Sequence, residues 1–174
     1  PQDPAGDDAL AQALTALLLI AAVAACGRAK EEAAAPTQEA RGFVLTRSLA
    51  GKTEWRLESP LAVFDEKSNK ANLETPKVAL YKAGRRDTDA KADKGEIDLR
   101  THDMELTGKV RVENPAEKIT VSTDQLLYVS GPSEFRTERP VEIRRPEGVM
   151  RGRGLTANGD LSVIRVHQQE TRVE

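Results

Sequence analysis

The 174-residue sequence has little of the material from which most active sites are built. It contains one cysteine and two histidines, so it forms no intramolecular disulfide and offers few imidazoles for a metal or acid–base site. Lysine and arginine number 26, aspartate and glutamate 28, and the net charge is -2. This balance argues against a nucleic-acid binder that depends on bulk positive charge. We therefore predict a protein that is not an enzyme, with no catalytic residue, no metal site, no cofactor and no nucleic-acid partner.

Charged residues are absent from residues 9–26, ALAQALTALLLIAAVAAC. A membrane-spanning helix needs about 20 apolar residues, whereas the apolar core of a signal peptide needs about 7–15 followed by small residues. Here Val23, Ala24 and Ala25 lead into Cys26, a pattern that resembles a bacterial lipobox. It predicts a signal peptide or membrane anchor over residues 1–26, in which the Cys26 thiol is lipidated and the signal peptide is cut immediately before Cys26; a short transmembrane helix is the alternative.

Residues 27–42, GRAKEEAAAPTQEARG, are rich in alanine and glutamate and have no sustained apolar face. Such a segment gains little by packing against a core. We expect a flexible tether between the anchor and a folded domain.

From residue 43 to the C-terminus, apolar and polar residues alternate, which is typical of strands with one buried face. Polar residues such as Arg56, Lys109 and Glu142 occupy the second parity, and turn signals recur at short spacing. The pattern predicts an all-β, antiparallel domain over residues 43–174, with Asn158-Gly159 as a two-residue hairpin turn. The apolar parity contains Trp55, Leu57, Ala62, Phe64, Val78, Leu80, Ile97, Leu99, Met104, Leu106, Val110, Val112, Ile119, Val121, Leu126, Tyr128, Val141 and Ile143.

Several segments of the domain, in their order and spacing, resemble the LptC family of lipopolysaccharide-export proteins. They are WRLESPLAVFD at 55–65, LETPKVALY at 73–81, MELTGKVRV at 104–112, ITVSTDQLLY at 119–128, RPVEI at 139–143 and GRGLTA at 152–157. The resemblance implies an open, twisted antiparallel β-jelly roll of the OstA type on the periplasmic side of the inner membrane. It also implies a protein that receives lipopolysaccharide from an ABC transporter and passes it to an LptA-like periplasmic protein.

Under this interpretation, the apolar parity lines a groove for the acyl chains of lipid A. Edge strands expected near residues 43–47 and 163–166 pair with the neighbouring proteins. Alternation alone favours a sealed core over an open groove, and it is the resemblance that favours the groove. A sealed core corresponds to the alternative function, a structural lipoprotein of the cell envelope without lipid cargo.

Two further motifs have simpler explanations. Residues 152–157 match a dinucleotide-binding pattern, but that pattern requires a helix after it, and a strand is expected instead. A basic cluster could bind the phosphates of lipid A or form a solvated strand face; it consists of Arg144, Arg145, Arg151 and Arg153.

Overall fold

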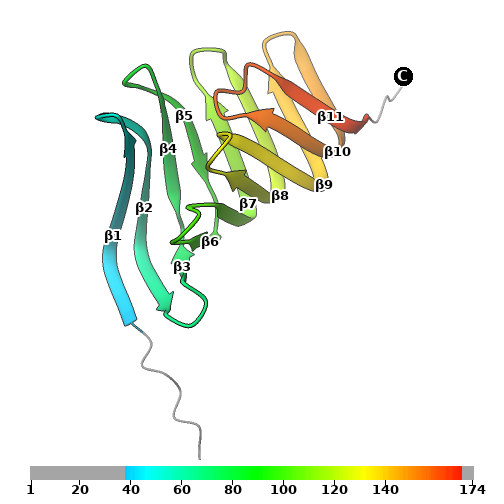
Figure 1. The fold of residues 1–174 in the computed structure, drawn as a ribbon. Coiled ribbons are helices and arrows are strands. Elements are labelled where there is room, and N and C mark those ends of the chain that lie inside the picture. The colour runs from blue at the N-terminus through cyan, green and yellow to red at the C-terminus, as the bar shows by residue number, and fades with distance from the viewer. Residues whose placement is uncertain (1–37, 170–174) are drawn as a thin grey trace, which may run out of the picture. The chain divides into compact units, whose positions relative to one another are not determined.

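The computed structural model describes residues 38–169, which lie in the compact unit Thr37–Glu174. These residues form one antiparallel sheet of eleven strands (Figure 1). The all-β prediction is confirmed for this part of the chain. Within residues 38–169, no helix is long and apolar enough to cross a membrane. The predicted anchor over residues 1–26 and most of the predicted tether lie outside the described residues.

The strands follow one another with short connections. They are β1 (Gln38–Leu49), β2 (Lys52–Asp65), β3 (Lys70–Glu74), β4 (Lys77–Lys82), β5 (Arg85–Lys91), β6 (Lys94–Asp98), β7 (Met104–Asn114), β8 (Ile119–Val129), β9 (Glu134–Arg145), β10 (Gly148–Asn158) and β11 (Ile164–Gln169). β1 begins at Gln38, where the pairing of Gln38 with Phe64 of β2 starts. The last residues of the predicted tether, 38–42, therefore belong to the sheet.

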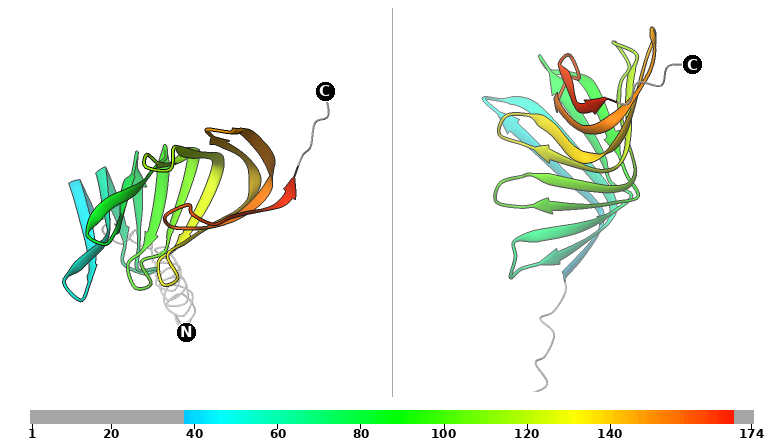
Figure 2. Two further views of the ribbon diagram at one scale, coloured as in Figure 1. Left: turned by 90° about the horizontal axis from the view of Figure 1, so that it is seen from above. Right: turned by 90° about the vertical axis from the view of Figure 1, so that its right-hand side faces the viewer.

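The long strands each belong to two walls of the folded sheet. In β2, residues 55–58 pair with β4 and residues 61–65 pair with β3. In β7, residues 104–107 pair with β6 and residues 111–113 pair with β5. We call the two halves the β4–β5 wall and the β3–β6 wall, each continued by the matching halves of the long strands. Figure 2 shows the sheet bent between them.

Irregularities in neighbouring strands line up along the bend. The register shifts between Thr107 and Val110 in β7, between Thr123 and Leu127 in β8, and between Arg153 and Leu155 in β10. A β-bulge bends its strand and increases the local twist. Because the bulges occur at matching heights, the whole sheet folds along one line.

Hydrogen bonds bridge this line where the shorter strands end. The Ser59 hydroxyl donates to the carbonyl of Glu74 at 2.8 Å, and the Thr75 N–H donates to the carbonyl of Asp93 at 2.9 Å. The Asp93 N–H in turn donates to the carbonyl of Gly108, at 2.9 Å. These bonds pair backbone groups that would otherwise be left without partners in the gaps between β3 and β4 and between β5 and β6.

The predicted hairpin at Asn158-Gly159 exists as a longer connection. β10 ends at Asn158 and β11 begins at Ile164. Neither Asn158 nor Gly159 has positive φ; Leu161 does, at 56°, and its side chain is buried. The two-residue turn was therefore a wrong prediction, because burying Leu161 in the interior requires a wider loop. The side chain of Asn158 stabilises that loop by accepting the Val163 N–H at 2.8 Å.

Adjacent leucines in β8 provide a test of which face is buried. Leu126 is 0% exposed and Leu127 is 39% exposed. Leu126→Ala is expected to lower the free energy of unfolding by about 2–5 kcal/mol, since it leaves a cavity in the core. Leu127→Ala, the matched control, is expected to change it by less than about 0.5 kcal/mol. Urea unfolding of the full chain measures both, and equal losses for the two variants would contradict the assignment of the buried face.

Candidate functional site

The inner faces of the two walls form one apolar interior. All the residues of the predicted apolar parity belong to it, and all but Phe64, Leu99 and Ile119 are buried. Trp55 and Leu57 project from the β4–β5 wall, and Leu106 and Leu126 project from the β3–β6 wall. The structure thus brings the predicted residues together on one face.

The interior also contains residues that the sequence analysis missed. Leu73, Phe135, Leu155 and Leu161 are each 1–2% exposed. Leu73, Phe135 and Leu155 alternate with polar neighbours in the same way as the predicted residues, so their parity was an available signal. Leu161 lies in a connection outside any strand, and only the fold shows that it points inward.

The expected open groove is closed in this conformation. Trp55, Leu57, Leu106 and Leu126 are 0–1% exposed, because side chains from the two walls pack against one another. Exposed apolar surface costs about 25 cal/mol per Å² in water, so apolar walls that can reach each other come together. The interior is therefore a closed apolar layer between two walls.

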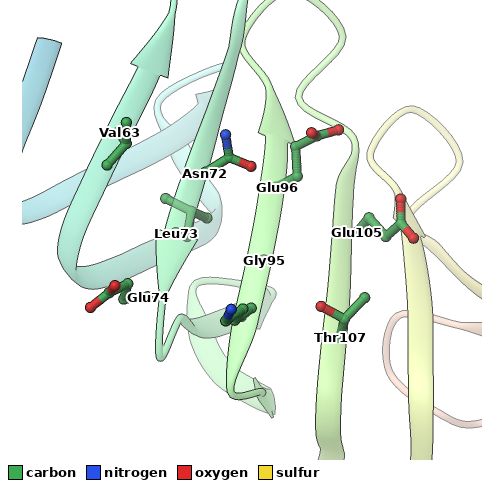
Figure 3. A pocket seen from close by; sticks show the side chains of 9 residues that line it. Val63, Asn72, Leu73, Glu74, Gly95, Glu96, Glu105 and Thr107 are labelled. Atoms are coloured by element: carbon green, nitrogen blue, oxygen red, sulfur yellow. The ribbon is translucent and has the colours of Figure 1, made fainter. Parts of the chain in front are cut away.

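Pockets occur on the outer face of the sheet. One, of about 390 Å³, is lined by Asn72, Glu96 and Glu105, which are in register on β3, β6 and β7 (Figure 3). These side chains have the polar parity, and Glu96 forms an ion pair with Lys70 at 2.5 Å. The lining of this pocket mixes acidic side chains with Val63 and Lys94, and the sheet separates the pocket from the apolar interior.

The ends of the apolar interior are lined by half-buried apolar residues. At one end, Phe43 of β1 packs edge-on against Phe64 of β2, with ring centroids 5.6 Å apart. At the other end, Ile164 and Val166 of β11 pack against the core. The apolar layer therefore extends across the whole sheet, from its first strand to its last.

Both terminal strands are edges, as predicted. Within residues 38–169, β1 pairs only with β2, and β11 pairs only with β10. Each therefore has one side whose backbone N–H and C=O groups are not used by the sheet. The two ends of the apolar interior thus coincide with the two strands that can accept another strand.

Close approach of β10 to β11 explains the glycine-rich segment at residues 152–157. A Cβ on Gly152 would lie 2.4 Å from Val166 Cγ1, and Gly154 has φ of +74° with the His167 ring 2.7 Å from the position of a Cβ. These glycines are needed for strand packing. The segment lies in β10 and is followed by β11, so it is no dinucleotide-binding turn.

The basic cluster lies on the solvated face. Arg144 and Arg151 both bind Glu142, each at 2.8 Å, with the arginine side chains 65% and 66% exposed. Hydrogen bonds from Arg144 and Arg151 lower the pKa of Glu142 below its ordinary value.

Among residues 38–169, no three His, Cys, Asp or Glu side chains are grouped so that they could hold a metal ion.

Polar contacts connect the two walls opposite the bend. Lys82, at the end of β4, forms an ion pair with Asp160 in the connection between β10 and β11. Asn114 donates from Nδ2 to the carbonyl of Asp160 at 2.8 Å. Trp55 Nε1 and Arg47 Nη1 both donate to the Ser130 hydroxyl, at 3.2 and 2.7 Å. We call this side, where the tips of the two walls meet, the mouth.

Charges at the mouth stabilise one another. The hydrogen bond to Asp160 and its charge raise the pKa of Lys82. Burial raises the pKa of Asp160, but the hydrogen bonds from Lys82 and Ser162, with the charge of Lys82, outweigh it and leave that pKa below its ordinary 3.8. Both groups are therefore charged at neutral pH.

Together these features define a class of protein: one sheet folded around a closed apolar interior, whose first and last described strands each pair on one side only. A family described as "Lipopolysaccharide-assembly, LptC-related" matches residues 9–174. The chain belongs to this family, as the segments quoted above predicted, and it therefore has a part in lipopolysaccharide export. Among curated proteins, none is similar enough to this chain to count as a match.

Acid should weaken the contact between Lys82 and Asp160. Because the pKa of Asp160 is lower in the folded state, its contribution to stability is present above about pH 4 and is lost as the pH falls through the folded pKa. Asp160→Asn is expected to cost about 0.5–1 kcal/mol of unfolding free energy near pH 7, since the pair is partly exposed. The difference from the wild type should shrink as the pH falls below about 4, as measured by urea unfolding at each pH. A difference that stays constant with pH would show that the charge of Asp160 is not what stabilises the fold.

Proposed function

We propose that this protein is the membrane-anchored periplasmic component that carries lipopolysaccharide from an inner-membrane ABC transporter to an LptA-like protein. It binds the acyl chains of lipid A between its two walls and leaves the sugars in solvent. The observation that carries the proposal is the continuous apolar interior that ends at the two edge strands. Membership of the LptC-related family supports lipopolysaccharide as the cargo.

The energetics of an acyl chain require such an interior. Each CH₂ group moved from hydrocarbon into water costs about 0.8 kcal/mol, so a chain of about a dozen carbons needs a long apolar surface. In the closed protein, this surface is covered by contacts between the walls. When an acyl chain separates the walls, contacts between their apolar side chains are replaced by contacts with the acyl chain. The net free-energy cost of opening is therefore small compared with exposing the walls to water.

The edge strands provide a way to extend the interior into neighbouring proteins. A strand added to β1 or β11 forms main-chain hydrogen bonds with the unpaired side of that strand. Because Phe43 and Val166 lie near these two edges and pack against the core, the partner's own apolar face would continue the interior. We propose that one edge binds the transporter and the other binds the LptA-like protein.

A lipid on Cys26, or an apolar helix over residues 9–26, holds the domain at the periplasmic face of the inner membrane. The tether before β1 lets the domain reach partners away from the bilayer.

A second function is favoured by the tight burial of the inner face. A structural lipoprotein of the cell envelope, without lipid cargo, would have the same anchor and edges and a core that never opens. The two functions differ in whether the walls separate to bind an acyl chain.

Site-specific photo-crosslinking distinguishes them. A photoreactive phenylalanine analogue is placed at Phe64 or Leu126 on the inner face, and at Leu127 as the matched outer control. We expect lipopolysaccharide to be captured from Phe64 and Leu126 at least about tenfold more than from Leu127, because acyl chains contact only the inner face. Circular dichroism confirms that each variant is folded. Equal capture at the three positions, or none at Phe64 and Leu126, would reject the proposed function.

The anchor is tested by Cys26→Ala. If the thiol carries the lipid, the variant should move from the membrane pellet to the soluble fraction, because one uncut apolar segment of about 18 residues is short for stable spanning. Carbonate extraction of membranes followed by immunoblotting measures the distribution, with Ser48→Ala as a control variant in the sheet. Full retention in the membrane would identify residues 9–26 as a spanning helix.

A further inference from the structure

We propose that the polar contacts at the mouth form a latch that keeps the apolar interior closed and must open before an acyl chain can enter from the side. The latch consists of Lys82 with Asp160 and of Trp55 and Arg47 with Ser130. This inference rests on the proposed function and adds the route by which the cargo reaches the interior.

The contacts join parts of the sheet that no strand pairing joins. Lys82 belongs to the β4–β5 wall, whereas Asp160 connects β10 and β11 in the β3–β6 wall, and the two residues are 78 positions apart. Trp55 is 75 positions from Ser130, and Arg47 is 83 positions from it. Apart from packing of the interior, the latch and the hydrogen bond from Asn114 to Asp160 hold the tips of the walls together.

Both latch partners in the β3–β6 wall are held in position by their neighbours. Asp160 Oδ1 accepts the Ser162 N–H at 3.0 Å, and the Ser130 N–H donates to Asp103 Oδ1 at 2.8 Å. The carboxylate of Asp160 and the backbone of Ser130 are therefore positioned by contacts within the β3–β6 wall. Opening the latch breaks contacts between the walls and leaves each wall intact.

A pocket lies at the mouth beside the latch. It has a volume of about 230 Å³, and its lining includes Leu80, Lys82, Asp87, Ser133, Gly159 and Asp160. Leu80 belongs to the apolar interior, and a Cβ on Gly159 would lie 2.9 Å from Leu80 Cδ2. The connection between β10 and β11 therefore lies directly over an apolar residue of the interior, and moving it away would expose the inner face to solvent.

The chemistry of the latch differs from that of the rest of the interface between the walls. Apolar contacts are not directional, and an acyl chain can replace them. A methylene group cannot replace a hydrogen bond or an ion pair, so inserting a chain at the mouth loses these contacts outright. The latch therefore sets the barrier to lateral insertion, while the apolar layer sets the affinity.

The test uses the full chain in detergent with the photoreactive analogue at Phe64, where lipopolysaccharide capture is followed over time. The latch variant combines Lys82→Ala with Ser130→Ala. Lys82→Ala alone is a milder variant, because the Lys82 side chain is exposed. Arg56→Ala is the matched control, because Arg56 pairs with Glu58 on the outer face and the two side chains are 46% and 51% exposed. Hydrogen exchange at the β4–β5 hairpin and the β10–β11 connection reports opening without cargo.

We expect the latch variant to raise the initial capture rate, and the exchange rate at these two hairpins, by about fivefold or more. Lys82→Ala alone should have an intermediate effect, and Arg56→Ala should have none. Unchanged capture and exchange rates in the latch variant, with the wild type capturing lipopolysaccharide, would overturn the latch and leave the proposed function standing. Faster exchange in the latch variant, with no capture by any variant or by the wild type, would support the latch and overturn the proposed function.

Discussion

The structure depends on contact between the two halves of the one apolar face of a folded sheet. A sheet with a single apolar face must bury that face against something, and most domains use a second sheet or a layer of helices. Here the sheet bends so that its inner face is buried against itself, and Trp55 and Leu57 of one wall join Leu106 and Leu126 of the other in a single buried cluster. The edges, the mouth and the closed interior all follow from this arrangement.

Folding a sheet in this way leaves its first and last strands without partners. A closed barrel would pair β1 with β11 and remove both edges. In this protein, the bend brings the inner faces together while β1 and β11 stay at opposite ends of the strand order. An apolar interior that reaches both edges is suited to be one segment of a longer conduit, which agrees with the membership of a lipopolysaccharide-assembly family.

Apolar and polar contacts have different parts in this design. The apolar layer is stabilised by burial, which does not distinguish a leucine side chain from an acyl chain. The hydrogen bonds to Ser130 and the ion pair of Asp160 require particular atoms at particular distances. Under the proposed function, the first kind of contact binds the cargo and the second keeps the walls together when the protein is empty.

The sequence by itself determined which residues face inward, because side chains in a strand alternate with a period of two and the pattern is local. The parity of Leu126 and Leu127 and the all-β class could therefore be predicted from the pattern, and the resemblance of several segments to a family predicted the family and the two edge strands. Only the tertiary structure decided that the walls lie in contact, that Leu161 turns inward from a loop, and that Lys82 meets Asp160. These features join residues far apart in the chain, and their positions depend on how the aligned bulges bend and twist the sheet, which no local pattern specifies.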